Sequence, residues 1–201
     1  MRDKANHYYS EKPRSRYERW LISDYIRGVS VEFVVSPGVF SKSRVDPGTK
    51  ILLEHAHIPD DGLVLDVGAG YGVIGIVIAK VNPKLKVYMV EINKRAIELA
   101  LENIKRNNVE DRVIVLHGNL YEPVKNMKFN LVISNPPYSA GMKVVESLIR
   151  GAYDILLEGG SLQVVARKGS ESVKKLMRNV FSNVEVIGRG SGYKVFKSTR
   201  Q

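Results

Sequence analysis

The stretch Val64-Leu-Asp-Val-Gly-Ala-Gly-Tyr-Gly72 decides the fold of this chain. The apolar run at 63–67 predicts a buried strand, and three glycines at alternate positions follow it directly. The apolar residues at 73–80 then predict a helix. A strand that turns through glycines into a helix is the first half of a βαβ unit, with a backbone-lined loop at the carboxyl end of the strand.

Outward from this loop, strands and helices alternate to the end of the chain. The last two strands have no helix between them, so one of them is expected to run antiparallel. The sequence therefore predicts an α/β fold: a Rossmann-like, mostly parallel sheet of seven strands, with helices on both faces. The predicted strands lie at 63–67, 86–90, 113–116, 131–134, 162–166, 184–187 and 193–196, and the predicted helices at 73–80, 93–107, 142–157 and 172–181.

Residues 1–60 are interpreted as an N-terminal extension, and residues 61–201 as the main domain. Ser15-Arg-Tyr-Glu18 has the form of a capping box, and Tyr17, Trp20, Leu21 and Tyr25 recur at helical spacing, which predicts a short helix. A hairpin is expected next, with strand 31–35, a turn at Pro37-Gly38 and a return strand at 39–40. A turn at 46–49 leads into another short helix.

Composition excludes several classes of site. The chain has 201 residues and no Cys, which removes disulfides, thiolate nucleophiles and Cys-based zinc sites. Of four His, His55 and His57 stand too close to share one helix face, so no metal site is expected. No run approaches the roughly 20 apolar residues of a membrane span, and the N-terminus has no signal-peptide core. A cytoplasmic protein is expected, and its net charge of +10 favours a nucleic-acid partner.

The spacing of the glycines bears on the ligand of the loop. A dinucleotide fingerprint places its third glycine where this chain has Val73. Asp66 before the loop would repel phosphates and suits a ligand that carries an ammonium group. The alternative is a tight strand-to-helix turn that binds nothing.

Polar residues also end the next two predicted strands. Glu91, followed by Ile92, can accept both hydroxyls of a ribose, and Asn119, followed by Leu120, can contact an adenine amino group. An amino acid joined to an adenosine without phosphates describes S-adenosylmethionine. The predicted cofactor-binding residues are Asp66, Gly68, Ala69, Gly70, Gly72, Glu91, Ile92, Asn119, Leu120 and Asn135.

The strand at 131–134 breaks into Asn135-Pro136-Pro137-Tyr138, a rigid NPPY turn at the ligand end of the sheet. The Asn135 side-chain oxygen and the Pro136 carbonyl can accept the two hydrogens of an exocyclic amine, and Tyr138 can stack on a flipped base. These four residues are the predicted catalytic site of a methyl transfer that needs neither a metal nor a covalent nucleophile. The alternative is a strand terminator with incidental Asn and Tyr.

From about residue 60 to residue 200 the chain resembles the class I methyltransferases. The resemblance is carried by residues 66–72, Glu91, Asn119 and the NPPY tetrapeptide at 135–138. It implies S-adenosylmethionine as cofactor, an amino-methylating activity, and a seven-stranded sheet whose last strand is antiparallel.

A narrower resemblance extends upstream. Gly38-Val-Phe-Ser41, Asp46-x-Gly-Thr49 and Leu52-Leu53 are similar to the segment before the catalytic domain in small-subunit ribosomal RNA guanine-N2 methyltransferases. Archaeal single-domain relatives also begin with a stretch like Tyr9-Ser-Glu-Lys-Pro13. Two features depart from the bacterial enzymes: the second, N-terminal copy of the domain that they carry is not expected here, and Tyr138 stands where they usually have Phe.

The resemblance and the charge together imply ribosomal RNA or a pre-ribosomal particle as substrate. Basic residues interleave with Tyr8, Tyr9, Tyr17 and Trp20 near the N-terminus, a mixture that suits backbone neutralisation and base stacking, so the extension is expected to contact RNA. Three alternatives stay open at this point: another RNA base in tRNA or large-subunit rRNA, a protein glutamine, and a non-catalytic RNA-binding module.

Overall fold

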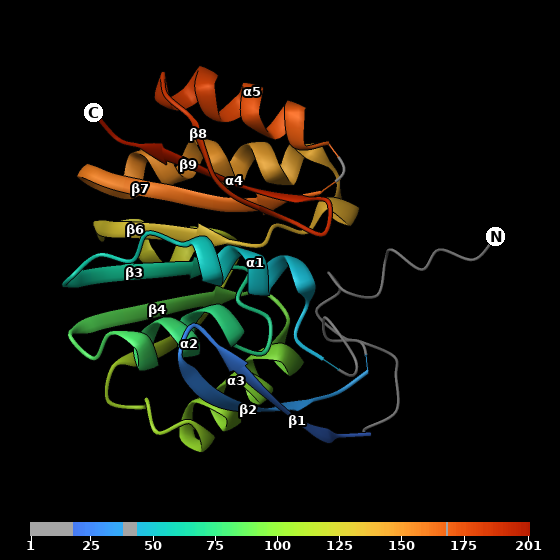
Figure 1. The fold of residues 1–201 in the computed structure, drawn as a ribbon. Helices are drawn as coiled ribbons and strands as arrows, with labels where there is room; N and C mark the ends of the chain where they lie inside the picture. Colours follow the sequence, from blue (N-terminus) through green and yellow to red (C-terminus); the bar gives the residue numbers. More distant parts are fainter. Residues whose placement is uncertain (1–17, 38–43, 168) are drawn as a thin grey trace.

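A computed structural model of the chain describes residues 18–37, 44–167 and 169–201. Its main sheet has the strand order β5-β4-β3-β6-β7-β9-β8 (Figure 1). The five strands from β5 to β7 pair in parallel, and β9 runs antiparallel to both β7 and β8. The predicted seven-stranded sheet with an antiparallel last strand is confirmed. The strands are β3 (Gly62–Val67), β4 (Leu85–Glu91), β5 (Val113–His117), β6 (Phe129–Ser134), β7 (Leu156–Ala166), β8 (Glu185–Gly190) and β9 (Tyr193–Thr199).

Helices cover both faces of this sheet, as predicted. Alternate residues of a strand point to opposite faces, and β3 therefore feeds two cores: Val64 packs in the first, with the apolar residues of α1–α3, and Leu65 in the second, with those of α4 and α5. Both side chains are fully buried. The helices are α1 (Pro47–His55), α2 (Val73–Val81), α3 (Lys94–Arg106), α4 (Met142–Ile155) and α5 (Ser170–Phe181), with short 3-10 turns η1 (Glu122–Val124) and η2 (Tyr138–Ala140).

The N-terminal hairpin differs from the prediction. β1 (Trp20–Ile26) pairs antiparallel with β2 (Val29–Val35), so the predicted helix through Trp20, Leu21 and Tyr25 is wrong over these residues. Leu21, Ser23 and Tyr25 are exposed while the residues between them are more buried, a period of two that the aromatic spacing obscured. Ser15–Tyr17 and the predicted return strand at 39–40 lie outside the described residues.

The turn of this hairpin explains why the strand at 31–35 pairs with the preceding segment. Arg27 and Gly28 have φ angles of 51° and 82°. Two consecutive left-handed residues give the type of tight turn that matches the twist of antiparallel strands. A β-hairpin in the N-terminal extension is thus confirmed, but β1 and β2 form it around Arg27-Gly28. The predicted pairing of 31–35 with 39–40 is not tested, because 38–43 lie outside the described residues.

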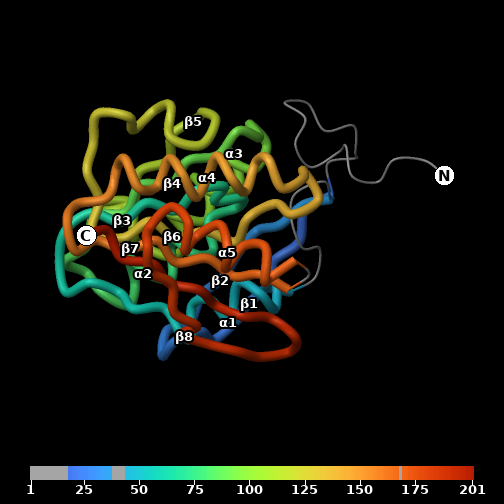
Figure 2. Tube along the Cα trace, turned by 90° about the horizontal axis from the view of Figure 1, so that it is seen from above, coloured from blue at the N-terminus to red at the C-terminus, as the bar shows by residue number. Residues whose placement is uncertain are grey.

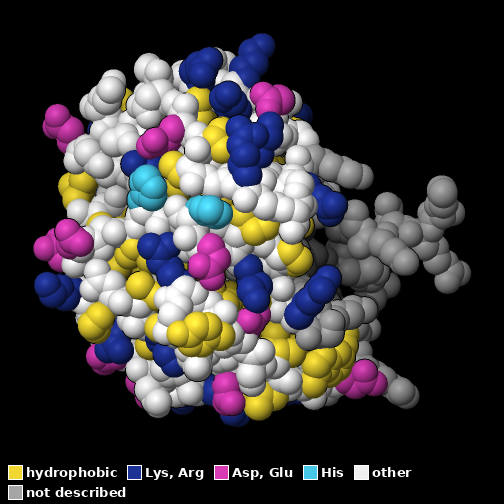
Figure 3. Space-filling view, viewed as in Figure 1, with side chains coloured by type: hydrophobic (Ala, Val, Ile, Leu, Met, Phe, Trp, Pro, Cys, Tyr) yellow, Lys and Arg dark blue, Asp and Glu magenta, His cyan; other side chains and the backbone are white. Residues whose placement is uncertain are grey.

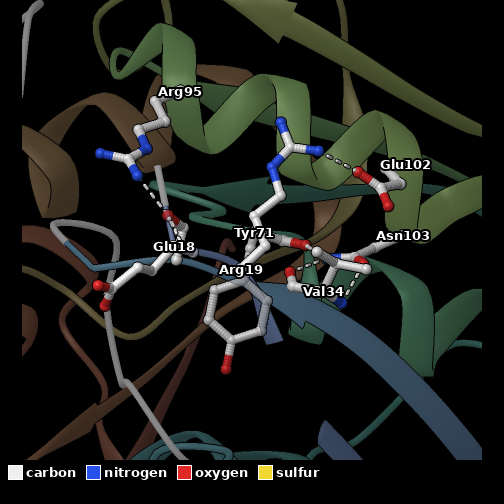
Figure 4. Close-up of polar contacts among 8 residues, drawn as sticks. Glu18, Arg19, Val34, Tyr71, Arg95, Glu102 and Asn103 are labelled. Carbon is white, nitrogen blue, oxygen red and sulfur yellow. Dashed lines mark hydrogen bonds and ion pairs between the residues drawn. The ribbon is translucent and has the colours of Figure 1, made fainter. Parts of the chain in front are cut away.

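Side-chain amides at the C-terminal end of α3 fasten the hairpin to the domain, and Figure 4 shows that of Asn103. The Asn103 amide nitrogen donates to the carbonyl oxygens of Val34 and Tyr71, and its oxygen accepts from the Val34 N–H at 2.7 Å. Asn107 makes the equivalent pair of bonds to the backbone of Glu32. The two asparagines therefore satisfy backbone groups of β2 that a neighbouring strand would otherwise pair.

Helix α1, which precedes the main sheet in the chain, packs against β8 and β9. Asp46 caps α1, because its carboxylate accepts from the N–H of Thr49 at 2.9 Å, and Pro47 occupies the first helical turn. A Cβ atom at Gly48 would lie 2.7 Å from the ring of Tyr193, so the start of α1 touches β9. Seen from above, the red β8–β9 strands pass beside α1 (Figure 2).

Candidate functional site

A cavity of about 280 Å³ opens at the carboxyl ends of β3, β4, β5 and β6. Open α/β sheets place ligands at this edge. The predicted residues Gly68, Ala69, Gly70, Glu91, Ile92, Asn119, Leu120, Asn135, Pro136 and Pro137 line it. These predicted residues, which lie between positions 68 and 137, thus meet around one space.

The glycine loop forms the floor of the cavity. The N–H groups of Gly68 and Ala69 donate to the Val90 carbonyl, which ties the loop to β4. Gly68 has a φ of 74°, and a Cβ atom there would meet nothing within 4 Å, so the position faces open space. Gly72 has a different role, because a Cβ atom would crowd Met89 and Ile76 at 3.2 and 3.1 Å. Gly72 lets α2 pack closely on the sheet and does not line the cavity.

Glu91 is buried at the end of β4, and backbone N–H groups surround its carboxylate. One oxygen accepts from Ile92 and Asn93, and the other accepts from Gly70 at 2.8 Å. Burial raises the pKa of Glu91, and the backbone hydrogen bonds act in the opposite direction. A carboxylate oxygen that accepts one N–H keeps lone pairs for a ligand, so Glu91 can still accept hydroxyls from the cavity.

Asp66 lies beneath the loop and is fully buried. One of its oxygens accepts from the N–H of Gly75 in α2 at 3.1 Å, and the other has no hydrogen-bond partner among the described residues. Burial raises the pKa of Asp66 to about 8, and the nearby Glu91 charge adds to the rise. The residue does not line the cavity, so direct contact with an ammonium group stays a prediction.

Asn119 and Leu120 form the wall that follows β5. The Asn119 side chain is exposed, and its backbone N–H donates to Glu122 at 3.2 Å. Leu120 has a φ of 50°, an unusual value for a residue with a side chain. This turn carries both residues to the cavity, and their contact with an adenine stays a prediction.

The tetrapeptide begins where β6 ends. The Ser134 hydroxyl donates to the Val67 carbonyl at 2.7 Å and fixes β6 to β3 just before the break. The Asn135 amide nitrogen donates to the Asp46 carboxylate at 2.8 Å and to the Thr49 hydroxyl at 2.9 Å. The Pro136 carbonyl already accepts from the N–H of Tyr138, and its second lone pair is free to accept from a ligand.

Tyr138 is anchored away from the cavity. Its hydroxyl donates to the Val165 carbonyl at 2.7 Å, and its ring packs with the core beneath α4 and α5. Burial raises the pKa of this hydroxyl. Tyr138 does not line the cavity, so its stacking on a base stays a prediction.

Sequence reasoning assigned no role in the site to several lining residues. Asp46 and Thr49 line the cavity from α1, 86 to 89 positions before Asn135. Tyr71 lies edge-on to Phe33 at 5.6 Å, and Val144 and Leu148 add an apolar wall from α4. A capping Asp before Thr predicts only a helix start, and the resemblance carried by Asp46-x-Gly-Thr49 does not itself indicate a contact with Asn135.

The structure also bears on metal binding and on membrane-spanning helices, for the described residues alone. Within 18–37, 44–167 and 169–201, no group of three or more His, Asp or Glu side chains could hold a metal ion. In the same residues no helix is both long and apolar enough to cross a bilayer. The segments Tyr9–Pro13 and Gly38–Ser41 lie outside the described part of the chain.

Comparison with known proteins agrees with this architecture. Residues 30–197 match the methyltransferase small domain family. Over 200 residues the chain is 32% identical to YbxB of Bacillus subtilis, an uncharacterized protein, with 98% of this chain and 99% of that protein covered.

Two further relatives carry more specific names. Ribosomal RNA small subunit methyltransferase C of Yersinia pestis is 35% identical over 193 residues, which cover 94% of this chain and 54% of the relative. The structure of a T. thermophilus 16S rRNA N2 methyltransferase, RsmC, in complex with AdoMet and guanosine superposes with a TM-score of 0.81 at 24% identity, and covers 94% of this chain and 53% of that one.

The chain thus spans about half the length of the rRNA methyltransferases that it matches. The family match runs from residue 30 in β2 to residue 197 in β9 and includes every residue that lines the cavity. The resemblance of the sequence to methyltransferases is confirmed, and the chain belongs to the methyltransferase small domain family.

Proposed function

We propose that this protein is an S-adenosylmethionine-dependent methyltransferase that acts on an exocyclic amino group of RNA, namely guanine N2 in small-subunit ribosomal RNA. The observation that carries the proposal is that one cavity is lined both by the glycine loop with Glu91 and by Asn135 with Pro136 and Pro137. The proposed cofactor site and the proposed amine-holding tetrapeptide would therefore share one space.

The residues present fit this cofactor. Gly68 faces open space and Glu91 offers a carboxylate on the cavity wall. No Lys or Arg belongs to the described residues that line the cavity, which suits a ligand without phosphates. Glu91 would accept hydrogen bonds from the ribose hydroxyls, and the turn at Asn119 and Leu120 would border the adenine. The carboxylates that line the cavity, Asp46 and Glu91, would favour the cationic amino acid end of the cofactor.

The chemistry needs only positioning from the protein. S-adenosylmethionine supplies an electrophilic methyl group when it is bound. The Asn135 oxygen and the Pro136 carbonyl would hold the two hydrogens of the target amine, which turns the nitrogen lone pair towards the cavity. Alignment of two reactants in this way accounts for several kcal/mol of a barrier, about 7–11 in favourable cases.

The surface charge supports RNA over a protein substrate. Lys and Arg side chains gather over α5 and the neighbouring β8 and β9, at the top of the view in Figure 3. Four basic residues of β8, β9, α5 and the end of β7 lie near the carboxyl edge of the sheet and are called the basic rim here: Arg167, Lys174, Arg189 and Lys194. Lys194 bonds Glu171 at 2.7 Å and, with Lys174 and Arg189, lowers the pKa of that carboxylate.

The basic rim adjoins the cavity. Arg167 lies over the ring of Tyr193 at 5.4 Å, and that ring meets Gly48, two residues after the cavity residue Asp46. A nucleic-acid backbone that crosses the rim would bring its bases towards Asn135. A guanine N2 lies on the Watson–Crick edge, so the target must be unpaired or flipped out to enter.

The relatives support the same substrate. The Yersinia pestis relative is named for small-subunit ribosomal RNA methylation, and the T. thermophilus neighbour is an N2 methyltransferase solved with guanosine. These names suggest the base, and the cavity chemistry is compatible with it.

The experiment is radiolabelled methyl transfer from S-adenosylmethionine to total RNA and to total protein, followed by nucleoside mass spectrometry. We expect N2-methylguanosine in small-subunit RNA, and loss of transfer in a folded Asn135→Ala protein. Label in glutamine, or in another nucleoside, would reject the substrate. Transfer at the wild-type rate by Asn135→Ala would reject the catalytic role of the tetrapeptide.

A further inference from the structure

Three side chains at the cavity form a hydrogen-bonded cluster that the proposed chemistry does not itself require. Both amide donors of Asn135 are engaged, with the Asp46 carboxylate at 2.8 Å and the Thr49 hydroxyl at 2.9 Å. The Thr49 hydroxyl is also 3.4 Å from the same Asp46 oxygen. All three residues line the cavity.

The chemistry of this cluster fixes the direction of every bond. An ionised carboxylate can only accept, whereas a hydroxyl can donate and accept. The Thr49 hydroxyl therefore donates a hydrogen bond to Asp46 and accepts one from the Asn135 amide. The Asn135 amide must turn its NH₂ group towards both, and its oxygen is then the part of the side chain left to accept from a ligand.

The opposite orientation would be useless for the proposed reaction. The two ends of an asparagine amide are nearly equal in shape, so packing alone distinguishes them poorly. With the amide reversed, an NH₂ group would face the amino group of the substrate, and donor would meet donor. Contacts that select one orientation of the Asn135 amide would therefore favour the reaction.

The cluster stands on rigid elements. Asp46 is the N-cap of α1 and also accepts from the Thr49 N–H, and Thr49 is only 5% exposed. A Cβ atom at Gly48, between them, would lie 2.7 Å from the Tyr193 ring, so the start of α1 has little space in which to move. Asn135 follows directly after β6, whose end is fixed to β3 through Ser134.

We propose that Asp46 and Thr49 are positioning residues that hold the Asn135 amide with its oxygen towards the substrate amine. This role depends on the proposed function of Asn135, whereas the orientation of the amide follows from its contacts with Asp46 and Thr49. It predicts separate effects on the amide itself and on turnover.

The first test follows the amide without any need for activity. In nitrogen-15 spectra, the side-chain NH₂ signals of Asn135 are identified by their absence in Asn135→Ala. We expect slow proton exchange in the wild-type protein and faster exchange in Thr49→Val, with Thr49→Ser close to wild type. Asn183, whose amide donates to Phe181 and Thr199, provides an unaffected internal control.

The second test measures turnover. Loss of one hydrogen bond to the amide is expected to lower kcat about tenfold in Thr49→Val, with KM for RNA and the Kd of S-adenosylmethionine unchanged. Thr49→Ser restores the hydroxyl and most of the rate. Asp46→Asn keeps an oxygen for the helix cap but adds a donor, which admits the reversed amide and also lowers kcat.

The outcomes separate the two proposals. Fast exchange of the Asn135 amide in the wild-type protein, or exchange indifferent to Thr49→Val, overturns the positioning role whatever the protein methylates. A weaker Kd for S-adenosylmethionine with unchanged kcat would instead make Asp46 and Thr49 cofactor contacts. A protected, Thr49-dependent amide in a protein that transfers no methyl group would reject the proposed function and leave the geometry intact.

Discussion

The carboxylate of Glu91 accepts a hydrogen bond at 2.8 Å from the backbone N–H of Gly70, so the end of β4 holds the glycine loop that follows β3. Glu91 therefore has two tasks in one position. It fixes the loop from below, and it lines the cavity at which the loop is aimed. A substitution here is expected to affect ligand binding through both.

Replacement of Glu91 by Ala should weaken S-adenosylmethionine binding. Loss of a charged hydrogen bond costs about 1.5–3 kcal/mol, or about 10- to 150-fold in Kd. Titration calorimetry measures the change, and circular dichroism checks the fold. Glu98→Ala, an exposed glutamate of α3, is the matched control. Equal affinity in Glu91→Ala and Glu98→Ala would remove Glu91 from the cofactor site.

Asp66 should make the stability of the free protein depend on pH. Its carboxyl ionises near pH 8 in the folded chain, against a usual pKa of 3.8. Between these values the folded state binds a proton that the unfolded state has released. The free energy of unfolding attributable to Asp66 therefore falls as pH rises, by up to about 1.4 kcal/mol per pH unit.

Asp66→Asn cannot ionise and should lose this slope. Urea unfolding at pH 5, 6.5 and 8 compares the two proteins, and the variant should gain on the wild type steadily across the range. Glu91, whose pKa is also raised, contributes to both proteins alike. Parallel stability curves for wild type and Asp66→Asn would show that Asp66 is ionised in the folded chain at all three values.

Much of the architecture could be predicted from the sequence because the sheet is built from short apolar runs with clear ends. Residues 63–67 and 131–134 were predicted strands and lie within β3 and β6. Cavity residues that immediately follow strands, such as Glu91 and Asn135, were found for the same reason: the carboxyl ends of parallel strands meet at one edge.

What the sequence concealed depends on contacts between distant segments. Trp20 and Tyr25 also fit a helical period, and only pairing with β2 makes β1 a strand. Thr49 reaches Asn135 across 86 positions, a contact that no local pattern carries. Asp66 is a predicted ligand contact, and its burial under the loop, off the cavity wall, was not evident from the sequence; the contact itself stays a prediction.

The docking of the hairpin should depend on Asn103. This side chain is fully buried and makes two hydrogen bonds to the backbone of Val34 and one to the backbone of Tyr71. Asn103→Ala would leave buried backbone groups unpaired, at about 1–3 kcal/mol for each. We expect a loss of at least about 2 kcal/mol in the free energy of unfolding, measured by urea titration.

A neighbour on the same helix supplies the control for Asn103. Glu102 forms an exposed ion pair with Arg19 at 3.0 Å, and exposed pairs contribute only about 0–1 kcal/mol. Glu102→Ala should therefore be nearly neutral. If Asn103→Ala is no more destabilised than Glu102→Ala, the amide bonds to β2 do not hold the hairpin.

The basic rim should contribute phosphate contacts to RNA binding. Arg167 and Arg189 are exposed at the carboxyl edge of the sheet, beside the cavity. Each cation that neutralises a phosphate releases counterions, so log K falls with log salt by about 0.7–0.9 per contact. The double variant Arg167→Glu with Arg189→Glu should bind small-subunit RNA more weakly and show a salt slope reduced by about one unit or more.

Lys84→Glu with Lys105→Glu makes the same change in net charge at exposed positions away from the rim. Fluorescence anisotropy at several salt concentrations compares the pairs, and titration calorimetry checks that the Kd of S-adenosylmethionine is unchanged in both. If the two pairs lose affinity equally and keep equal slopes, the RNA is attracted by net charge alone and the basic rim is not its contact surface.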